Sequence, residues 1–277
     1  MDIGHLSKWI GSEHEARDTI TPRLANSLAA VLDERCNLAA GDPAPLGIHW
    51  CLSPEIASMA MLGADGHPAR GGFLPPVPLP RRMWAGGELV VHGQLLVGDE
   101  VVRNSRVEDV KVKTGRTGTL CFVTVRHQYE TPNGMALTER QDIVYRETRG
   151  LAEAPHTAPH QADLVDEIEA TPALLMRYSA ATFNGHRIHY DRDYSRNEEL
   201  YPGLVVHGPL QATYLLRLSC QMNQGRPPRR IGFRSTAPLF DGNTLRINGR
   251  RVSDGQELWV ADNTGVVTMR ARTEQGK

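Results

Sequence analysis

The sequence has few aromatic residues, no excess of charge of either sign and no long apolar run. Aromatic side chains make up 6% of the 277 residues and the formal net charge is −1. Such a balance is not typical of a surface that binds nucleic acid or an anionic membrane. No run approaches the roughly 18 apolar residues of a transmembrane helix, and the charged first twenty residues hold no signal-peptide core. We therefore expect a cytoplasmic protein without nucleic-acid or membrane partners.

Cysteine is also scarce, with four residues spread along the chain and no C-x-x-C pair (Cys36, Cys51, Cys121, Cys220). This spacing matches neither a zinc site nor a redox motif, so we expect reduced, mostly buried thiols. The remaining composition is that of an ordinary globular protein, with 40% hydrophobic and 23% charged residues. The length suits one large domain or two of usual size.

The chain contains two similar helix starts. In "TITPRLANSLAAVLDE", Thr21 is a natural N-cap and Pro22 takes the first helical position, and in "EATPALLMRYSAATFN" the same roles fall to Thr171 and Pro172. The leucine that follows, Leu24 or Leu174, occupies the same place in each segment. The sequence therefore suggests an internal duplication.

Each helix start is followed by segments that alternate apolar and polar residues, over 87–147 in the first half and 230–274 in the second. Gly98-Asp99, Asn133-Gly134, Asp241-Gly242 and Asp254-Gly255 interrupt them, which is typical of hairpins in an antiparallel sheet. The order of helix and then strands predicts an α+β fold. We expect a first unit over 1–148, a linker over 149–164 rich in Ala and Pro, and a second unit over 165–277.

The second half carries a dense polar cluster directly after its helix: Asn184, His186, Arg187, His189 and Asp191. His186 and His189 have a spacing that suits a metal, but Arg187 lies between them and no cysteine is near, so no metal is expected.

Downstream, "YPGLVVHGPLQATYLLRL" predicts a helix that begins at His207-Gly208 with Pro209 in its first turn. The N–H of Gly208 would point out of that helix, where it can bind an oxyanion.

The segments "FNGHRIHYDRDYSR", "YPGLVVHGPLQ" and "FRSTAPLFDGNTL" resemble the MaoC-like, or (R)-specific, enoyl-CoA hydratases and 3-hydroxyacyl dehydratases. The resemblance implies a tandem (double) hotdog fold, in which curved antiparallel sheets each wrap around a central helix. It also implies that the first unit is degenerate and covers the substrate, while the second is catalytic. The family's catalytic histidine falls on His189 and its H-G pair on His207-Gly208.

The sequence departs from the family pattern at three positions. Asn184 stands where the family has a catalytic Asp, His186 where it has Asn, and Arg187 where it has Pro. An Asn amide cannot accept a proton near neutral pH, although it can hold a water. The variant motif resembles a subgroup that hydrates itaconyl-, mesaconyl- and methylfumaryl-CoA, and it also occurs in related fatty-acid dehydratases.

These resemblances imply a hydro-lyase without a cofactor that adds water to a short unsaturated dicarboxylyl-CoA thioester. His189 would be the general base, Asn184 would orient the water and the N–H of Gly208 would bind the thioester oxygen. Near the acyl group we expect His186, Arg187 and two residues of the Pro-rich loop 74–89, Arg82 and Trp84. Arg187 has an alternative role, tying the loop to Asp191 or Asp193.

Three arginines near the last motif segment, Arg229, Arg230 and Arg234, are the expected contacts for the CoA phosphates. Three other functions stay open: an (R)-specific 3-hydroxyacyl-CoA or acyl-carrier dehydratase, a hotdog thioesterase, and a non-catalytic acyl-CoA binding module. A homodimer is compatible with each of them.

Overall fold

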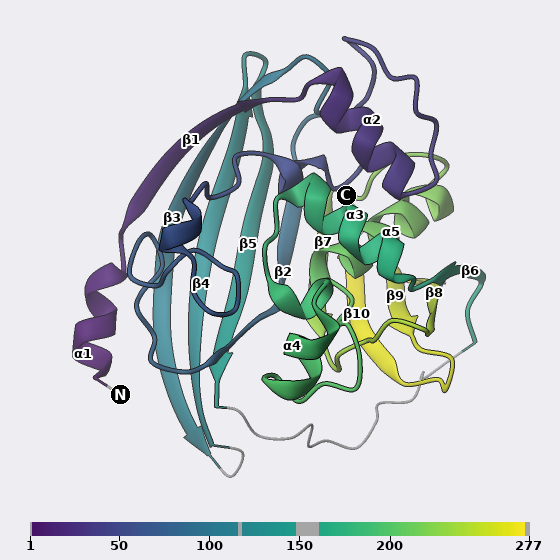
Figure 1. Ribbon diagram of the computed structural model, residues 1–277. Helices are drawn as coiled ribbons and strands as arrows, with labels where there is room; N and C mark the ends of the chain where they lie inside the picture. The colour runs from purple at the N-terminus through teal and green to yellow at the C-terminus, as the bar shows by residue number, and fades with distance from the viewer. Residues whose placement is uncertain (1, 116–117, 148–160, 275–277) are drawn as a thin grey trace.

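The computed structural model describes residues 2–115, 118–147 and 161–274. Ten strands form one antiparallel sheet in the order β1-β3-β4-β5-β2-β7-β10-β9-β8-β6, and α2, α3 and α5 lie on one side of it (Figure 1). The strands of the first half are β1 (Glu13–Thr19), β2 (Arg81–Val91), β3 (Glu100–Gly115), β4 (Gly118–Thr131) and β5 (Gly134–Arg146). Those of the second half are β6 (Leu164–Glu169), β7 (Arg230–Ser235), β8 (Thr244–Val252), β9 (Gly255–Ala261) and β10 (Val267–Glu274).

The two halves repeat one strand order. From its outer edge inward, the first half runs β1-β3-β4-β5-β2 and the second runs β6-β8-β9-β10-β7. They meet where β2 pairs antiparallel with β7, with Leu89 opposite Ile231. This curved antiparallel sheet with few helices confirms the α+β double-hotdog prediction. Most of the expected linker, 149–164, lies outside the described residues, and β6 already begins at Leu164.

Two of the four expected hairpin turns are correct. Asn133-Gly134 joins β4 to β5, and Asp254-Gly255 joins β8 to β9. The other two, Gly98-Asp99 and Asp241-Gly242, were wrongly assigned, because they lead from β2 to β3 and from β7 to β8, which are not neighbours in the sheet. A local turn signal marks where a strand ends and leaves its partner undetermined.

The expected helix starts are confirmed. Helices α2 (Pro22–Val31) and α3 (Pro172–Thr182) are capped by Thr21 and Thr171, whose side chains accept hydrogen bonds from the N–H groups of Leu24 and Leu174 at 3.1 Å. The remaining helices are α1 (Ile3–Leu6), α4 (Arg192–Asn197) and α5 (Gly208–Met222), with 3₁₀ turns at Ser7–Trp9, Ile48–Cys51, Met59–Met61 and Arg187–His189. Among the described residues, no helix is long and apolar enough to span a membrane.

Among the described residues, a long central helix is present only in the second half. There α5 packs against β2 and β6–β10, and most of its residues are buried. In the first half, residues 32–80 separate α2 from β2 and form only loops and 3₁₀ turns. The Pro-rich segment also differs from its expected form. Only 74–80 is a loop, and Arg82 and Trp84 lie on β2, because the prolines end at Pro80 and no longer prevent strand pairing.

Candidate active site

The polar cluster of the second half forms a compact loop after α3. Phe183 ends the helix in the left-handed conformation, and Asn184 then folds back so that its backbone N–H donates to the Ser179 carbonyl at 2.8 Å. The Asn184 side-chain oxygen accepts a hydrogen bond from the His186 N–H at 2.9 Å. These bonds fix the loop and direct the 3₁₀ turn Arg187–His189 beneath the start of α5.

The His189 ring is held by one hydrogen bond to the backbone. Its Nδ1 lies 2.7 Å from the carbonyl oxygen of Val205, and because a carbonyl only accepts hydrogen bonds, Nδ1 carries the proton. Nε2 is therefore left with a lone pair. His189 is buried, with only 7% of the residue exposed, which no local pattern predicted.

His207 stacks on His189, with ring centroids 3.6 Å apart and an 18° angle between the planes. Its Nε2 lies 2.8 Å from the Ser179 hydroxyl. Burial lowers the pKa of His189 to about 4, although the Val205 hydrogen bond acts to raise it. Burial and then the nearby His189 hold the pKa of His207 well below its usual value. Both rings are thus neutral near pH 7 and able to accept protons.

The first residue of α5 lies against an indole ring. A Cβ on Gly208 would stand 2.7 Å from Cε3 of Trp84, so glycine is required for this approach. The first turn of a helix leaves N–H groups without intrahelical acceptors, and the helix dipole favours negative charge there. The structure therefore brings two predicted residues, Gly208 and Trp84, together at a position suited to an oxyanion.

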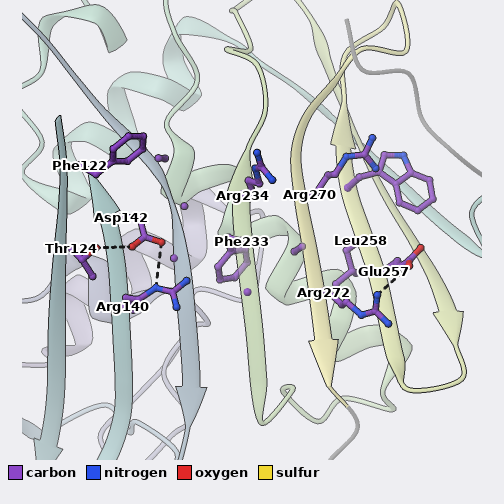
Figure 2. A pocket seen from close by; sticks show the side chains of 16 residues that line it. Phe122, Thr124, Arg140, Asp142, Phe233, Arg234, Glu257, Leu258, Arg270 and Arg272 are labelled. Atoms are coloured by element: carbon purple, nitrogen blue, oxygen red, sulfur yellow. Dashed lines mark hydrogen bonds and ion pairs between the residues drawn. The ribbon is translucent and has the colours of Figure 1, made fainter. Parts of the chain in front are cut away.

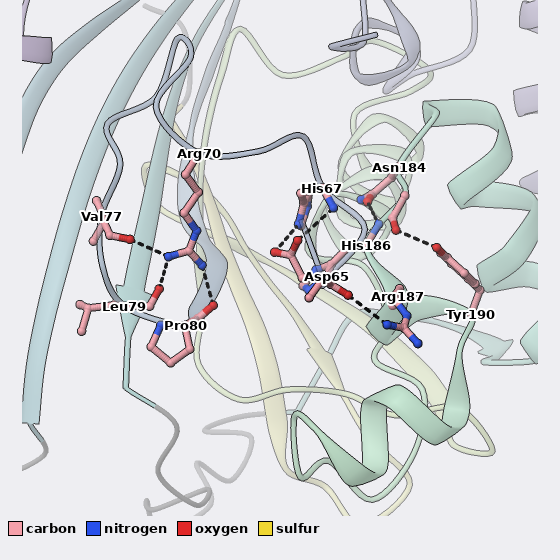
Figure 3. A network of polar contacts seen from close by, with 12 residues as sticks. Asp65, His67, Arg70, Val77, Leu79, Pro80, Asn184, His186, Arg187 and Tyr190 are labelled. Carbon is pink, nitrogen blue, oxygen red and sulfur yellow. Dashed lines mark hydrogen bonds and ion pairs between the residues drawn. The ribbon is translucent and has the colours of Figure 1, made fainter. Parts of the chain in front are cut away.

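A turn from the first half docks on the polar loop of the second (Figure 3). The Asp65 carbonyl accepts from the Arg187 N–H at 2.9 Å, and the Ala64 carbonyl accepts from the Arg187 guanidinium at 3.0 Å. Gly66, at φ +84°, passes so close that a Cβ on it would lie 2.1 Å from the Gly185 carbonyl oxygen. The site is therefore built from both halves of the chain.

That turn carries an Asp–His pair that sequence reasoning missed. Asp65 Oδ2 accepts from His67 Nδ1 at 3.1 Å, and the His67 ring lies 4.3 Å from that of His186. Burial and then the charge of Arg82 lower the pKa of His67 to about 4. Burial would raise the pKa of Asp65, but its hydrogen bonds with His67 lower it to about 2. The only sequence signal was an Asp-Gly-His-Pro turn, which carries no long-range information.

Asp65, His67 and His186 also have the composition of a metal site, with ligand atoms within 4.8 Å of one another. Two observations disfavour a cation there. Asp65 is already hydrogen-bonded to His67, and the positive charge of Arg82 acts on all three groups. An anion suits this place better.

The expected acyl-group residues differ in their surroundings. The Arg187 guanidinium donates from Nε and Nη2 to the same oxygen, Oδ2 of Asp191, at 3.0 and 2.8 Å. It also stacks over the Tyr194 ring, so the alternative role of tying the loop is the one seen here. The His186 ring lies between His67 and His189, at centroid distances of 4.3 and 5.4 Å. Substrate binding by these residues stays a prediction.

The arginines expected to bind CoA do not lie with the histidines. Arg234 points to the face of the sheet opposite the helices, where it lines a hollow of about 720 Å³ with Arg140, Arg270 and Arg272 (Figure 2). Arg230 lies within 4 Å of Glu88 and Glu274. Arg229 is exposed, and its backbone carbonyl accepts a bond from Val91. Alternation along β7 explains the placement, because Phe233 faces the core and its neighbour must face outward.

The buried histidines predict a loss of stability in acid. Histidine titrates near 6.5 in an unfolded chain, whereas burial lowers the pKa of His189 to about 4 and that of His127 to about 3. Below pH 6.5 the unfolded chain binds protons that the folded protein excludes, so the free energy of unfolding falls as pH drops towards 4. Urea midpoints from pH 7 to 4.5 should decrease steadily, and less steeply in His127→Gln. A flat profile would contradict the neutral cluster.

The fold and the site together define a class. The chain is similar to the solved structure of a MaoC-like dehydratase from Phytophthora capsici, with a TM-score of 0.72 and 16% identity over all of both chains. It is also similar to a Mycobacterium tuberculosis protein described as having a double hotdog fold, with a TM-score of 0.55 and 13% identity over 96% of each chain. The protein has the fold of these double-hotdog proteins.

Residues 47–241 match the family described as hydroxyacyl-thioester dehydratase type 2, and the chain belongs to that family. It is 40% identical to the mesaconyl-C(4)-CoA hydratase of Chloroflexus aurantiacus, over 100% of both chains. It is 26% identical to the mitochondrial hydroxyacyl-thioester dehydratase type 2 of Schizosaccharomyces pombe, covering 77% of this chain and 79% of the relative. The protein is a hydro-lyase of the enoyl-CoA hydratase type.

Proposed function

We propose that the protein hydrates the double bond of a short unsaturated dicarboxylyl-CoA thioester of the mesaconyl or itaconyl type. The observation that carries the proposal is the geometry of His189, whose Nδ1 is held by the Val205 carbonyl while its neutral Nε2 stays available as a base. The 40% identity to a mesaconyl-C(4)-CoA hydratase along the whole chain supports the choice of substrate.

In this mechanism the oxygen of a water attacks Cβ of the enoyl thioester while Nε2 of His189 takes a proton from that water. The electron pair of the double bond moves to Cα and the thioester oxygen, which the Gly208 N–H stabilises. Cα then takes a proton, which His189 can supply, and this returns His189 to its neutral form. Asn184 orients the water by hydrogen bonding and does not change its charge.

A panel of CoA thioesters tests the proposal. Purified protein is incubated with mesaconyl-C(4)-CoA, itaconyl-CoA and crotonyl-CoA, the enoyl absorbance is followed, and products are weighed by mass spectrometry. We expect hydrated acyl-CoA, with kcat/KM at least about 10²-fold higher for a dicarboxylyl substrate, because a buried site built for a charged group discriminates strongly. Equal or faster turnover of crotonyl-CoA would contradict the dicarboxylyl preference and indicate a general (R)-specific enoyl-CoA hydratase.

One alternative has an observation behind it. The matched family and the Schizosaccharomyces pombe relative are named for dehydration of hydroxyacyl thioesters. A 3-hydroxyacyl-CoA of medium chain length, added to the same panel, detects such a dehydratase as a gain of enoyl absorbance. Release of free CoA would instead indicate a thioesterase. A homodimeric assembly, a cytoplasmic location and CoA binding by Arg229, Arg230 and Arg234 stay predictions.

Asn184→Asp should remain active and change the pH profile. The Asn184 side-chain oxygen already accepts a bond from the His186 N–H, and a carboxylate can keep that bond. The new carboxyl group titrates, so a second ionisation should enter the acidic limb of kcat/KM. Profiles of both proteins from pH 4.5 to 9 check this. A variant profile that matches the wild type would show that residue 184 does not act on the reacting water.

A further inference from the structure

Arg82 is a cation without a carboxylate partner beside the histidine cluster. Within residues 2–115, 118–147 and 161–274 it forms no ion pair, and its neighbour on β5 is Tyr145. Its charge nevertheless acts on all three groups of the cluster. Burial and then the charge of Arg82 lower the pKa of His67. Burial also lowers the pKa of His186 most, with Arg82 adding to the effect, whereas at Asp65 burial raises the pKa and Arg82 acts against it. Arg82 and a protonated His67 together outweigh the single negative charge of Asp65, so this place favours the binding of an anion.

The Asp65–His67 pair is arranged to complete such an anion site. Asp65 fixes His67 through two hydrogen bonds. Its carboxylate accepts one from the ring Nδ1 and one from the His67 backbone N–H, each at 3.1 Å. This leaves Nε2 of His67 for another partner. The side chains of Asp65 and His67 keep 18% and 16% exposure, more than the 6% and 7% of His186 and His189. An entering anion would therefore reach this pair before the base.

Arg82 also stands at a suitable spacing from the expected thioester site. Arg82 and Trp84 are two residues apart on β2, which corresponds to roughly 6.6 Å along a strand, and Trp84 lies against Gly208. The carboxyl carbons of a trans four-carbon diacid are about 3.8 Å apart, as are consecutive Cα atoms across a trans peptide. A diacid of this length, extended by a hydrogen bond at each carboxyl end, fits between Arg82 and the thioester site beside Trp84.

We propose that Arg82 and the Asp65–His67 pair, both from the first half of the chain, bind the free carboxylate of the substrate. This inference rests on the proposed function and assigns its specificity. The guanidinium offers two parallel donors to the carboxylate. His67 donates through Nε2 in its protonated form, which the entering carboxylate stabilises together with Asp65, the acceptor of the Nδ1 hydrogen bond. The substrate thereby brings a negative charge into a site in which Asn184 supplies none. Arg187 does not take this role, because Asp191 already occupies its guanidinium.

Two CoA thioesters that cannot be hydrated test the subsite separately from the chemistry. Succinyl-CoA carries a free carboxylate, whereas butyryl-CoA has the same chain length without one. Calorimetric Kd values are measured for both ligands with the wild type, Arg82→Met, Arg82→Lys, His67→Ala and, as a matched arginine on the opposite face of the sheet, Arg140→Met.

We expect the wild type to bind succinyl-CoA at least about 10²-fold more tightly than butyryl-CoA. Arg82→Met should reduce this ratio to near one, and His67→Ala should reduce it about tenfold. Arg82→Lys should keep part of it, because it retains the charge without the bidentate geometry. Arg140→Met should leave the ratio as in the wild type, because this arginine lies on the face of the sheet opposite the histidines. Retained binding of butyryl-CoA shows that each variant is folded.

A preference that survives in both Arg82→Met and His67→Ala overturns the subsite, and so does its loss in Arg140→Met. If Arg82→Met does not fold, the Arg82→Lys and His67→Ala ratios decide. The proposed function fails in a different way, when the wild type binds succinyl-CoA selectively but hydrates no dicarboxylyl substrate. A wild type without any preference for succinyl-CoA rejects both.

Discussion

Replacing His189 by Asn should lower kcat for hydration by at least about 10²-fold, the usual contribution of a general base. Asn has an amide N–H near the position of Nδ1, so it can keep the donation to the Val205 carbonyl that now spans 2.7 Å. It has no basic nitrogen at the position of Nε2. The variant thus removes the lone pair and spares the buried hydrogen bond, which His189→Ala would not.

Stability must be followed beside rate, because His189 is buried and stacked on His207. His127→Gln serves as the matched control. That residue is a buried histidine on β4, bonded to the Ser105 hydroxyl at 2.8 Å, and burial lowers its pKa to about 3. We expect both variants to melt below the wild type and only His189→Asn to lose the rate per folded molecule. A His189→Asn enzyme that keeps more than roughly a tenth of wild-type kcat would show that another group is the base.

Gly66→Ala should disable the site from the other half of the chain. The added Cβ would lie 2.1 Å from the Gly185 carbonyl oxygen, a backbone atom that cannot rotate away. The turn must then move off the polar loop and carry Asp65 and His67 with it. Because displacements of about 1 Å in a site cost on the order of 10²-fold, we expect a loss of that size in kcat/KM for a dicarboxylyl substrate.

Gly41→Ala separates this clash from backbone strain. Gly41 has φ +90°, close to the +84° of Gly66, but a Cβ on it meets nothing within 4 Å. Both variants should lose about 1–2 kcal/mol of stability, because an L side chain is strained in the left-handed region. Only Gly66→Ala should lose activity, which kinetics on folded protein and urea midpoints together measure. Equal kcat/KM in the two variants would mean that docking of the turn is irrelevant to the reaction.

Local signals in the sequence predicted much of the second half. Thr171 and Pro172 start a helix through their own chemistry, and Gly208 begins α5 for the same kind of reason. The density of polar residues in 184–191 predicted a site, and the structure brings His186 and His189 next to His207, the residue before Gly208, through short loops. Such features depend on neighbours within a few residues, which a single sequence records.

What could not be predicted depends on pairing across the chain. Nothing near Asp65 or His67 indicates that their turn docks more than a hundred residues away, because the docking rests on backbone atoms of Gly66, Gly185 and Arg187. The sequence likewise does not indicate that β2 pairs with β7, since both strands show the same alternation of apolar and polar residues as their neighbours. That pairing also determines that Arg234 faces away from the histidines.

The proposed hydration with His189 as the base is tested most directly in water enriched in oxygen-18. Mesaconyl-C(4)-CoA is the substrate, and the acyl-CoA and any free acid are analysed by mass. We expect one heavy oxygen in a hydroxyl group of an intact acyl-CoA, and a drop of at least about 10²-fold in its rate of appearance with His189→Asn. Heavy oxygen in a released acid together with free CoA, or intact acyl-CoA formed equally fast by His189→Asn, would contradict it.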